Sequence, residues 1–257
     1  MSLSKEYIAQ QKMKKQAEAD NLARKERQNI VNTIQNDSSQ SIPFDTIIYT
    51  TLDNTPLSLR ADLNGIVSNT YVDGYGVVQF SGPIYTIRKD LFYSCLMLTS
   101  ITIPECVSSI EADAFHGCTN LQTVNISSLA SWCMIDFASA KSTPLYYGAT
   151  LMLNKQPIEI VHIPQNITTI KDFAFANYES IKEVYIHEYV QYIGRCAFNG
   201  CHNLKIVKFD GTTPPKIGGK AFGRNNSERL IYVPSESVER YQYKSGWIEL
   251  FYHIKGY

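Results

Sequence analysis

A short motif that recurs every 23 or 24 residues constrains the fold of this chain more than any other feature of its sequence. The motif begins at Ile87, Ile110, Ile170, Ile193 and Ile217. Neighbouring copies are 23 residues apart at Ile87 and Ile110, 23 at Ile170 and Ile193, and 24 at Ile193 and Ile217. A fixed period of this size indicates a solenoid, in which each repeat must bury its apolar face against the next one.

Each copy of the motif combines a strand pattern with one tight turn. In Ile101-Thr102-Ile103 a polar residue separates two apolar ones, which predicts a short, half-buried strand. Pro104 cannot donate to a strand ladder and should end that strand. Phe92, Cys95 and Leu98 are spaced three apart, which predicts a helical or 3₁₀ turn with its side chains directed inward. We therefore expect a mostly β solenoid with short helical or 3₁₀ turns.

The full pattern, I-x4-F-x2-C-x2-L-x2-V-x-I-P-x2-V-x2-I, resembles the consensus of BspA-type leucine-rich repeat proteins from roughly Val78 to the C-terminus. Single copies depart from it at Tyr178, which replaces Cys, and at Ser127, His187 and Asp210, which replace Pro. The resemblance implies a right-handed leucine-rich-repeat solenoid. Members of this family are mostly surface, adhesion or phage-associated binding proteins, so the resemblance also implies recognition rather than catalysis.

The sequence outside the regular repeats predicts additional parts at both ends. Asp73-Gly74 is a strong signal for a hairpin turn ahead of the first repeat. A solenoid also needs caps that cover its open ends. We expect a helical arm with a polar linker at 1–40, an N-terminal β cap at 41–86, the solenoid at 87–234 and a helical C-terminal cap at 235–257.

One step of the solenoid is longer than the others. The step from Ile110 to Ile170 is more than twice as long as one period. The additional sequence, 127–160, is apolar and strand-like, and it is similar to a longer repeat variant of the same family. The alternative is an independent inserted domain, which would have too few residues for a core of its own. We therefore expect this segment to remain part of the solenoid.

The N-terminal segment favours one long helix. Residues 4–34 contain no Gly or Pro and are rich in Lys, Glu, Gln and Ala. Their apolar residues follow no sustained heptad, and they carry seven basic against four acidic side chains. A solvated, frayed helix with few contacts to the cap is one interpretation. The other is a helix that docks on an acidic surface of another subunit. Its docking side chains would be Tyr7, Ile8, Leu22, Ile30 and Ile34.

Charge and motif content argue against several functional classes. The chain has 24 Lys and Arg against 24 Asp and Glu, so nothing in its net charge indicates nucleic-acid or membrane binding. It contains no apolar run of membrane-spanning length and no H-E-x-x-H, G-x-S-x-G or P-loop motif. Cys95, Cys118 and Cys201 share one inward repeat position, so we expect reduced core thiols rather than disulfides or zinc ligands. We expect no enzymatic activity, no cofactor, no metal and no membrane span.

The first residues of the chain lack the hydrophobic segment that a secretory signal requires. The expected settings are therefore a virion or the cytoplasm. A cell-surface setting is expected if a leader has been removed.

Stacking the repeats should align the outward residue of every strand in one row, with about 4.7 to 4.9 Å between neighbours. Tyrosine and histidine side chains in such a row suit a binding face, although a simply solvated face is the alternative. The predicted row is Thr102, Asn125, His162, Tyr185, Lys208 and Tyr232, preceded by Gln79. A second row holds Ser100, Thr123, Ile160, Glu183 and Ile206.

These observations predict a non-enzymatic recognition or adhesion protein that binds a protein or a surface glycan through its repeat face. The alternative is a structural subunit of a larger assembly, such as a phage virion, that is anchored by the N-terminal helix.

Overall fold

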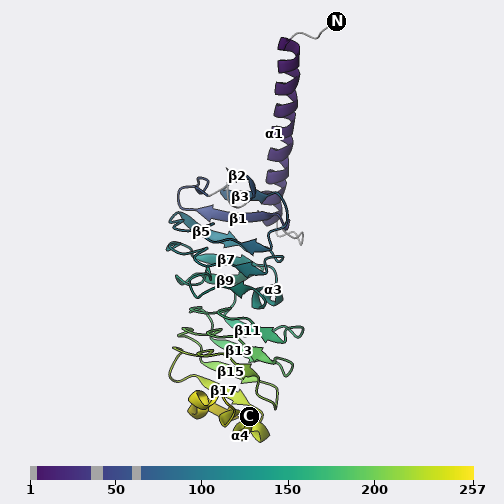
Figure 1. Cartoon of the computed structure of the whole chain (residues 1–257). Coiled ribbons are helices and arrows are strands. Elements are labelled where there is room, and N and C mark those ends of the chain that lie inside the picture. Colours follow the sequence, from purple (N-terminus) through teal and green to yellow (C-terminus); the bar gives the residue numbers. More distant parts are fainter. Residues whose placement is uncertain (1–4, 36–42, 60–64) are drawn as a thin grey trace.

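The computed structural model describes residues 5–35, 43–59 and 65–257. It shows an elongated stack of strands from which a long helix, α1 (Lys5–Gln35), projects at one end (Figure 1). Short helical segments and the C-terminus lie at the other end of the stack. The predicted fold class, a mostly β repeat solenoid with an N-terminal helical arm, is confirmed.

The outward strands form two separate sheets. The first has seven strands in the order β10-β9-β7-β5-β1-β3-β2, and the second has five in the order β11-β13-β15-β17-β18. The first sheet comprises β1 (Thr46–Thr51), β2 (Ile66–Val72), β3 (Tyr75–Phe80), β5 (Leu98–Thr102), β7 (Thr123–Ile126), β9 (Thr150–Leu153) and β10 (Gln156–Pro157). The second comprises β11 (Ile160–His162), β13 (Glu183–Ile186), β15 (Ile206–Phe209), β17 (Leu230–Val233) and β18 (Ile254–Gly256).

Two-residue strands form a second pair of ladders, β4-β6-β8 and β12-β14-β16. Their opening isoleucines pair directly, as Ile87 does with Ile110 and Ile193 with Ile217. Each solenoid turn therefore has one long strand and one short strand, each in register with the neighbouring turn. The short strands are β4 (Thr86–Ile87), β6 (Ser109–Ile110), β8 (Asp136–Phe137), β12 (Thr169–Ile170), β14 (Tyr192–Ile193) and β16 (Lys216–Ile217).

Equivalent side chains of successive repeats stack in columns inside the solenoid. The Phe92 and Phe115 rings are 5.2 Å apart and nearly parallel, at 7°. Phe198 lies between Phe175 and Phe222, at centroid distances of 5.1 and 5.3 Å and with interplanar angles of 3°. All five rings are buried. Stacking of these rings removes apolar area from water in each of these repeats.

The repeat cysteines form a second column. The Cys118 thiol donates to the Phe92 carbonyl at 3.0 Å, and the Cys201 thiol donates to the Phe175 carbonyl at 3.1 Å. Burial raises the pKa of both thiols to about 12, so they remain protonated at neutral pH. All six cysteines of the chain are free thiols. Cys118 and Cys201 therefore serve as small core side chains that also satisfy a carbonyl of the neighbouring repeat.

The N-terminal cap adds antiparallel strands to the repeat ladder. β1 lies between β3 and β5, so Ile48 pairs with Val77 on one side and with Thr102 on the other. The sequence prediction that placed Gln79 beside Thr102 was therefore wrong, because β1 occupies that place. A tight turn at Asp73 and Gly74, both with positive φ, joins β2 to β3 as predicted.

The last turns of α1 are attached to this cap. Val31 is fully buried, and Gln28 Nε2 donates to Asp73 Oδ2 in the hairpin turn at 2.6 Å. Ile48 and Val77 are also buried, although they face away from the main core, on the side of the sheet that carries the outward row. The contacts between the arm and the cap are few, as expected from the sequence, and they attach the C-terminal end of α1 while the rest of the helix projects (Figure 1).

The long step contains two intervals, one from Ile110 to Phe137 and one from Phe137 to Ile170. Both are longer than the regular period. Phe137 pairs with Ile110, and Leu151 pairs with Val124, so the first of the two forms both strands in register with the turn before it. Ile170 then opens the next repeat after a still longer interval. The short helix α3 (Leu129–Cys133) starts at Ser128, whose side chain accepts a hydrogen bond from the Ser131 backbone N–H. Strands β8 and β9 therefore continue the stack.

The outward ladder breaks immediately after this repeat. A tight turn at Asn154 and Lys155, both with positive φ, joins β9 to β10 in a hairpin. β9 therefore pairs with β10 instead of β11. Hydrogen bonds join the two halves instead. The Tyr178 hydroxyl, at a cysteine position of the repeat, lies 2.7 Å from the Ile158 carbonyl and 3.2 Å from that of Leu151.

A second contact across the break comes from α3. Trp132 is buried, and its Nε1–H donates to the carbonyl of Ala174, in the repeat that opens at Ile170, at 2.9 Å. The Lys171 backbone N–H donates to the Cys133 carbonyl at 3.0 Å. Lys171 Nζ also lies 2.8 Å from Asp136 Oδ1. Residues of α3 and β8 therefore contact the repeat that opens at Ile170 through polar groups.

The C-terminal segment closes the stack with two aromatic side chains. Tyr241 and Trp247 are fully buried, and their rings lie 5.6 and 5.2 Å from that of Phe209. Their polar ends donate to the carbonyls of Gly211 and Pro215. Besides the predicted helical segments, the cap supplies β18, which pairs with β17. Its helical segments are η1 (Ser235–Ser237), α4 (Val238–Gln242) and η2 (Ile248–His253).

Substitution of Phe198 by alanine tests the aromatic column. The change removes a ring that is stacked on both sides, so we expect a loss of about 3–5 kcal/mol in the free energy of unfolding, measured by urea denaturation. Phe44→Ala is the control, because Phe44 is 51% exposed and should change stability by less than about 0.5 kcal/mol. Equal effects of the two changes would contradict the column.

Substitution of Tyr178 by phenylalanine tests the junction. The Ile158 carbonyl loses the hydroxyl as its partner, so we expect a destabilisation of about 1–3 kcal/mol at pH 7. Burial raises the pKa of Tyr178 from 10.0 to about 12. The folded state therefore holds this proton more tightly than the unfolded chain, and stability is lost as the pH rises from about 10 to about 12.

The Tyr178→Phe variant should lose less stability over this alkaline range than the wild type. Tyr189→Phe is the matched control, because Tyr189 is exposed. If the Tyr178→Phe and Tyr189→Phe variants have the same unfolding free energy at pH 7 and over this alkaline range, the Tyr178 hydroxyl does not hold the junction.

Candidate functional site

The predicted outward row is divided between the two sheets. Thr102 and Asn125 are neighbours in the first sheet, but the next residue in register with Asn125 is Met152 rather than His162. The continuous row expected from the sequence is therefore corrected to two shorter ones. The N-terminal row is Ile48, Thr102, Asn125 and Met152. The C-terminal row is His162, Tyr185, Lys208, Tyr232 and Lys255.

The C-terminal row carries aromatic and cationic side chains in fixed positions. The His162 and Tyr185 rings stack at 4.6 Å with an interplanar angle of 10°. The Tyr185 hydroxyl donates to Glu183 Oε2 at 2.7 Å, and this hydrogen bond raises the pKa of Tyr185. Lys208 Nζ lies 4.1 Å from the centre of the Tyr257 ring. Each of these contacts limits the rotamers that the side chains can adopt.

An aliphatic row runs beside the C-terminal row. Register places Ile160, Glu183, Ile206 and Leu230 side by side on the same face. Ile160 is 49% exposed, whereas Ile206 and Leu230 are half-buried. This face of β11 to β18 therefore combines a row of polar aromatic and cationic groups with a row of three aliphatic side chains that is interrupted by Glu183. Such a combination is typical of interaction surfaces.

The N-terminal row has a different chemistry. Asn125 Nδ2 donates to Ser100 Oγ at 3.0 Å, and Thr50 Oγ1 lies 2.7 Å from Thr99 Oγ1. The row beside it consists of hydroxyl residues in register, namely Thr50, Ser100, Thr123 and Thr150. Several of these polar groups bond to one another, and this face offers no exposed aromatic row. It therefore provides fewer groups for a ligand than the C-terminal row does.

The side chains proposed for docking the arm fall into three groups. Leu22 is 59% exposed on the projecting part of α1. Ile30 is half-buried near the cap, beside the fully buried Val31, so it is less available to another subunit than predicted. The Tyr7, Ile8 and Ile34 side chains lie outside the described residues.

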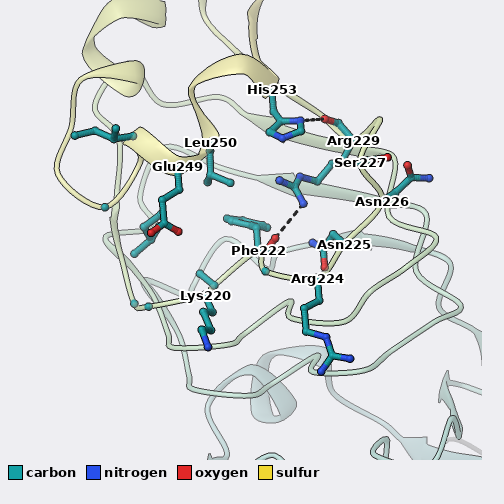
Figure 2. Close-up of a pocket in the computed structure, with 17 residues that line it drawn as sticks. Lys220, Phe222, Arg224, Asn225, Asn226, Ser227, Arg229, Glu249, Leu250 and His253 are labelled. Carbon is teal, nitrogen blue, oxygen red and sulfur yellow. Dashed lines mark hydrogen bonds between the residues drawn. The ribbon is translucent and has the colours of Figure 1, made fainter.

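A pocket at the C-terminal end of the stack was not predicted from the sequence. It has a volume of about 850 Å³ and lies between the residues that precede β17 and the η2 segment (Figure 2). Phe222 and Arg229 line it from the last repeat, and Leu250 and His253 from the cap. These two walls are separated along the chain by β17, η1 and α4, so no local motif predicts the pocket.

Within residues 5–35, 43–59 and 65–257, no group of three or more His, Cys, Asp or Glu side chains could hold a metal ion. No helix of the same ranges is long and apolar enough to cross a membrane.

Comparison with protein families assigns the repeats to a class. The model of the BspA-type leucine-rich repeat region matches residues 78–142 and 149–245 in six copies. The chain therefore belongs to the BspA-type leucine-rich repeat family. This membership supports a repeat-based binding or adhesion protein. Leucine-rich repeat proteins are generally non-enzymatic, which is consistent with the absence of catalytic motifs from the sequence.

Two solved structures are similar to the chain. One is a leucine-rich repeat protein from Bacteroides ovatus, with 17% identity, coverage of 68% of this chain and 48% of that one, and a TM-score of 0.32. The other is a leucine-rich cell surface protein from Faecalibacterium prausnitzii, with 19% identity, coverage of 85% and 56%, and a TM-score of 0.39. The chain thus spans about half the length of these proteins. No curated protein matches it.

Proposed function

We propose that the chain is a non-enzymatic recognition or adhesion protein that binds a protein or a surface glycan through its C-terminal row. The observation that carries this proposal is the register of His162, Tyr185, Lys208 and Tyr232 on adjacent strands. Tyrosine presents a large apolar ring and a polar tip, and such residues dominate the energetics of many interfaces.

The geometry of the row suits an extended ligand. Five strands at about 4.8 Å spacing give a row of about 19 Å from the first residue to the last. A linear peptide or oligosaccharide that crosses the strands would contact the ring of Tyr185, the ammonium of Lys208 and the ring of Tyr232 in turn. The aliphatic row beside them would exclude water from one side of the ligand.

The fixed positions of the side chains favour binding further. Strand pairing holds their backbones, and the contacts of Tyr185 with His162 and Glu183 hold its ring and hydroxyl. Less side-chain entropy is therefore lost when a ligand binds than on a flexible surface.

A printed glycan array and a displayed library of linear peptides test this proposal. We expect the purified chain to select members of one of these sets. The Tyr185→Ala and Tyr232→Ala variants should bind the selected members at least about tenfold more weakly, because each change removes a central aromatic contact.

The matched control is the double variant Thr102→Ala, Asn125→Ala, which alters the N-terminal row to a similar extent. It should retain binding. If the tyrosine variants bind as well as the wild type, or if the control loses binding equally, the C-terminal row is not the binding surface.

A second candidate function is that of a subunit in a larger assembly, anchored by α1. The observation that favours it is the exposure of residues 9–22, which project from the stack while the other end of the helix is fixed. Such a segment extends about 20 Å at 1.5 Å per residue. An isolated helix this polar is marginal in water, so contact with another chain would stabilise it.

Deletion of residues 1–24 tests this second candidate, because it removes the projecting part and keeps Gln28 and Val31 on the cap. We expect an unchanged melting temperature and the loss of any species heavier than the 29.1 kDa monomer, measured by light scattering after size exclusion. The full-length Leu22→Glu variant should weaken assembly, whereas Gln16→Glu should not. A monomeric wild type, or assembly that survives truncation, would contradict anchoring by the arm.

A further inference from the structure

The pocket at the C-terminal end of the stack contains a buried arginine (Figure 2). Arg229 is only 3% exposed. Its Nη1 donates to the carbonyl of Phe222 at 3.0 Å, and its guanidinium carbon lies 5.8 Å from the centre of the Phe222 ring. The backbone carbonyl of Arg229 is 2.9 Å from His253 Nδ1. These contacts hold the side chain against the pocket wall and satisfy only part of its donor capacity.

The positive charge of Arg229 has no acidic partner among the described residues, since no carboxylate of that part of the chain forms a salt bridge with it. Its Nε is buried and makes no hydrogen bond within the described structure. Burial lowers the pKa of Arg229 to about 10, so the guanidinium is still charged at neutral pH. An uncompensated buried charge is strongly unfavourable unless something pairs with it.

A second donor in the same pocket also lacks a partner. Asn225 lines the pocket, and its Oδ1 accepts a hydrogen bond from the Cys201 backbone N–H at 3.1 Å. This contact sets the orientation of the amide, because a backbone N–H must face the oxygen. The remaining Nδ2 is buried without a hydrogen-bond partner. Two donors without a partner, one of them charged, are therefore buried in the wall of this pocket, and each has almost no solvent-accessible area.

The repeat pattern gives no structural reason for this arginine. In the segments before their strands, earlier repeats bury the apolar residues Leu121, Ile181 and Leu204. In register, Glu228 corresponds to Leu204 and Arg229 corresponds to the exposed Lys205, so the last repeat buries a cation where the preceding repeat exposes one. An apolar residue there would fill the core without the cost of burying a charge.

We propose that this pocket binds a small organic monocarboxylate, with its carboxylate on Arg229 and Asn225. A planar guanidinium matches the geometry of a carboxylate, and charge-assisted hydrogen bonds of this kind are short and strong. Phe222, Leu250 and Ile248 provide apolar surface for the organic part of the ligand. This site is distinct from the C-terminal row, so it adds to the function proposed above and does not depend on it.

The charges around the pocket favour a monoanion over a phosphate dianion. Lys220, Arg224 and Arg229 oppose a single acidic lining residue, Glu249. In Figure 2 the charged ends of Lys220 and Arg224 point away from Arg229, so only one cation faces the interior. One guanidinium can neutralise one carboxylate, whereas a dianion would leave one negative charge uncompensated in a buried site.

Isothermal titration calorimetry with benzoate, glucuronate and inorganic phosphate tests the proposal on the full chain. We expect saturable binding of at least one carboxylate with a Kd of about 1 mM or below, and at least tenfold weaker binding of phosphate. Preference for benzoate would indicate an apolar ligand body, and preference for glucuronate a sugar acid. The absence of saturable binding by both carboxylates up to about 10 mM, or tighter binding of phosphate, would overturn the proposal.

Two variants assign the binding to the pocket. Arg229→Leu removes the charge and should weaken carboxylate binding at least tenfold. Asn225→Asp keeps an oxygen for the Cys201 N–H, replaces the free donor by an acceptor and places a negative charge in the pocket. It should weaken binding to a similar degree, and it keeps the test decisive if Arg229→Leu does not fold.

The matched control is Arg195→Leu, because Arg195 is exposed and lies outside the pocket. This variant should bind the carboxylate with unchanged affinity. The melting temperature of Arg229→Leu without ligand should equal or exceed that of the wild type, because an unpaired buried charge has been removed. Carboxylate binding that survives both pocket changes would show that the site lies elsewhere.

Discussion

The structure depends on one constraint, which is that a single repeat cannot bury its own apolar face. Each turn is stable only because identical positions of neighbouring turns pair, as Ile193 does with Ile217 and Phe198 with Phe222. The same constraint explains the ends of the molecule. Strand β1 covers the first open turn, and Tyr241 with Trp247 covers the last. The free energy of folding therefore accumulates along the stack by contacts between neighbours.

The constraint is relaxed at one place, and the chemistry of the outward face changes there. The register that pairs Phe137 with Ile110 puts Ser142 where the neighbouring repeats have Phe115 and Phe175, so the aromatic column is interrupted. Tyr178 and Trp132 join the halves by hydrogen bonds instead. Because the outward ladder breaks at the same level, a hydroxyl-rich face and an aromatic face are separated on one solenoid.

The proposed activities all lie on side chains that the repeat consensus does not specify. The outward tyrosines, the projecting part of α1 and the buried Arg229 belong to three different regions of the molecule. The solenoid supplies rigid positions for them, and their chemistry is independent of the fold that carries them. Family membership consequently accounts for the scaffold, whereas partners and ligands have to be argued from the individual sites.

The sequence by itself determined the repeat, the inward columns and the order of His162, Tyr185, Lys208 and Tyr232 in the C-terminal half, because these follow from periodic positions that pair in one register. Only the tertiary structure placed β1 between Gln79 and Thr102, and only the tertiary structure separated Asn125 from His162 by the hairpin of β9 and β10. It also decided the attachment of Val31 and the pocket around Arg229. The physical reason is that these features arise from contacts between segments far apart in the chain, which periodicity does not encode.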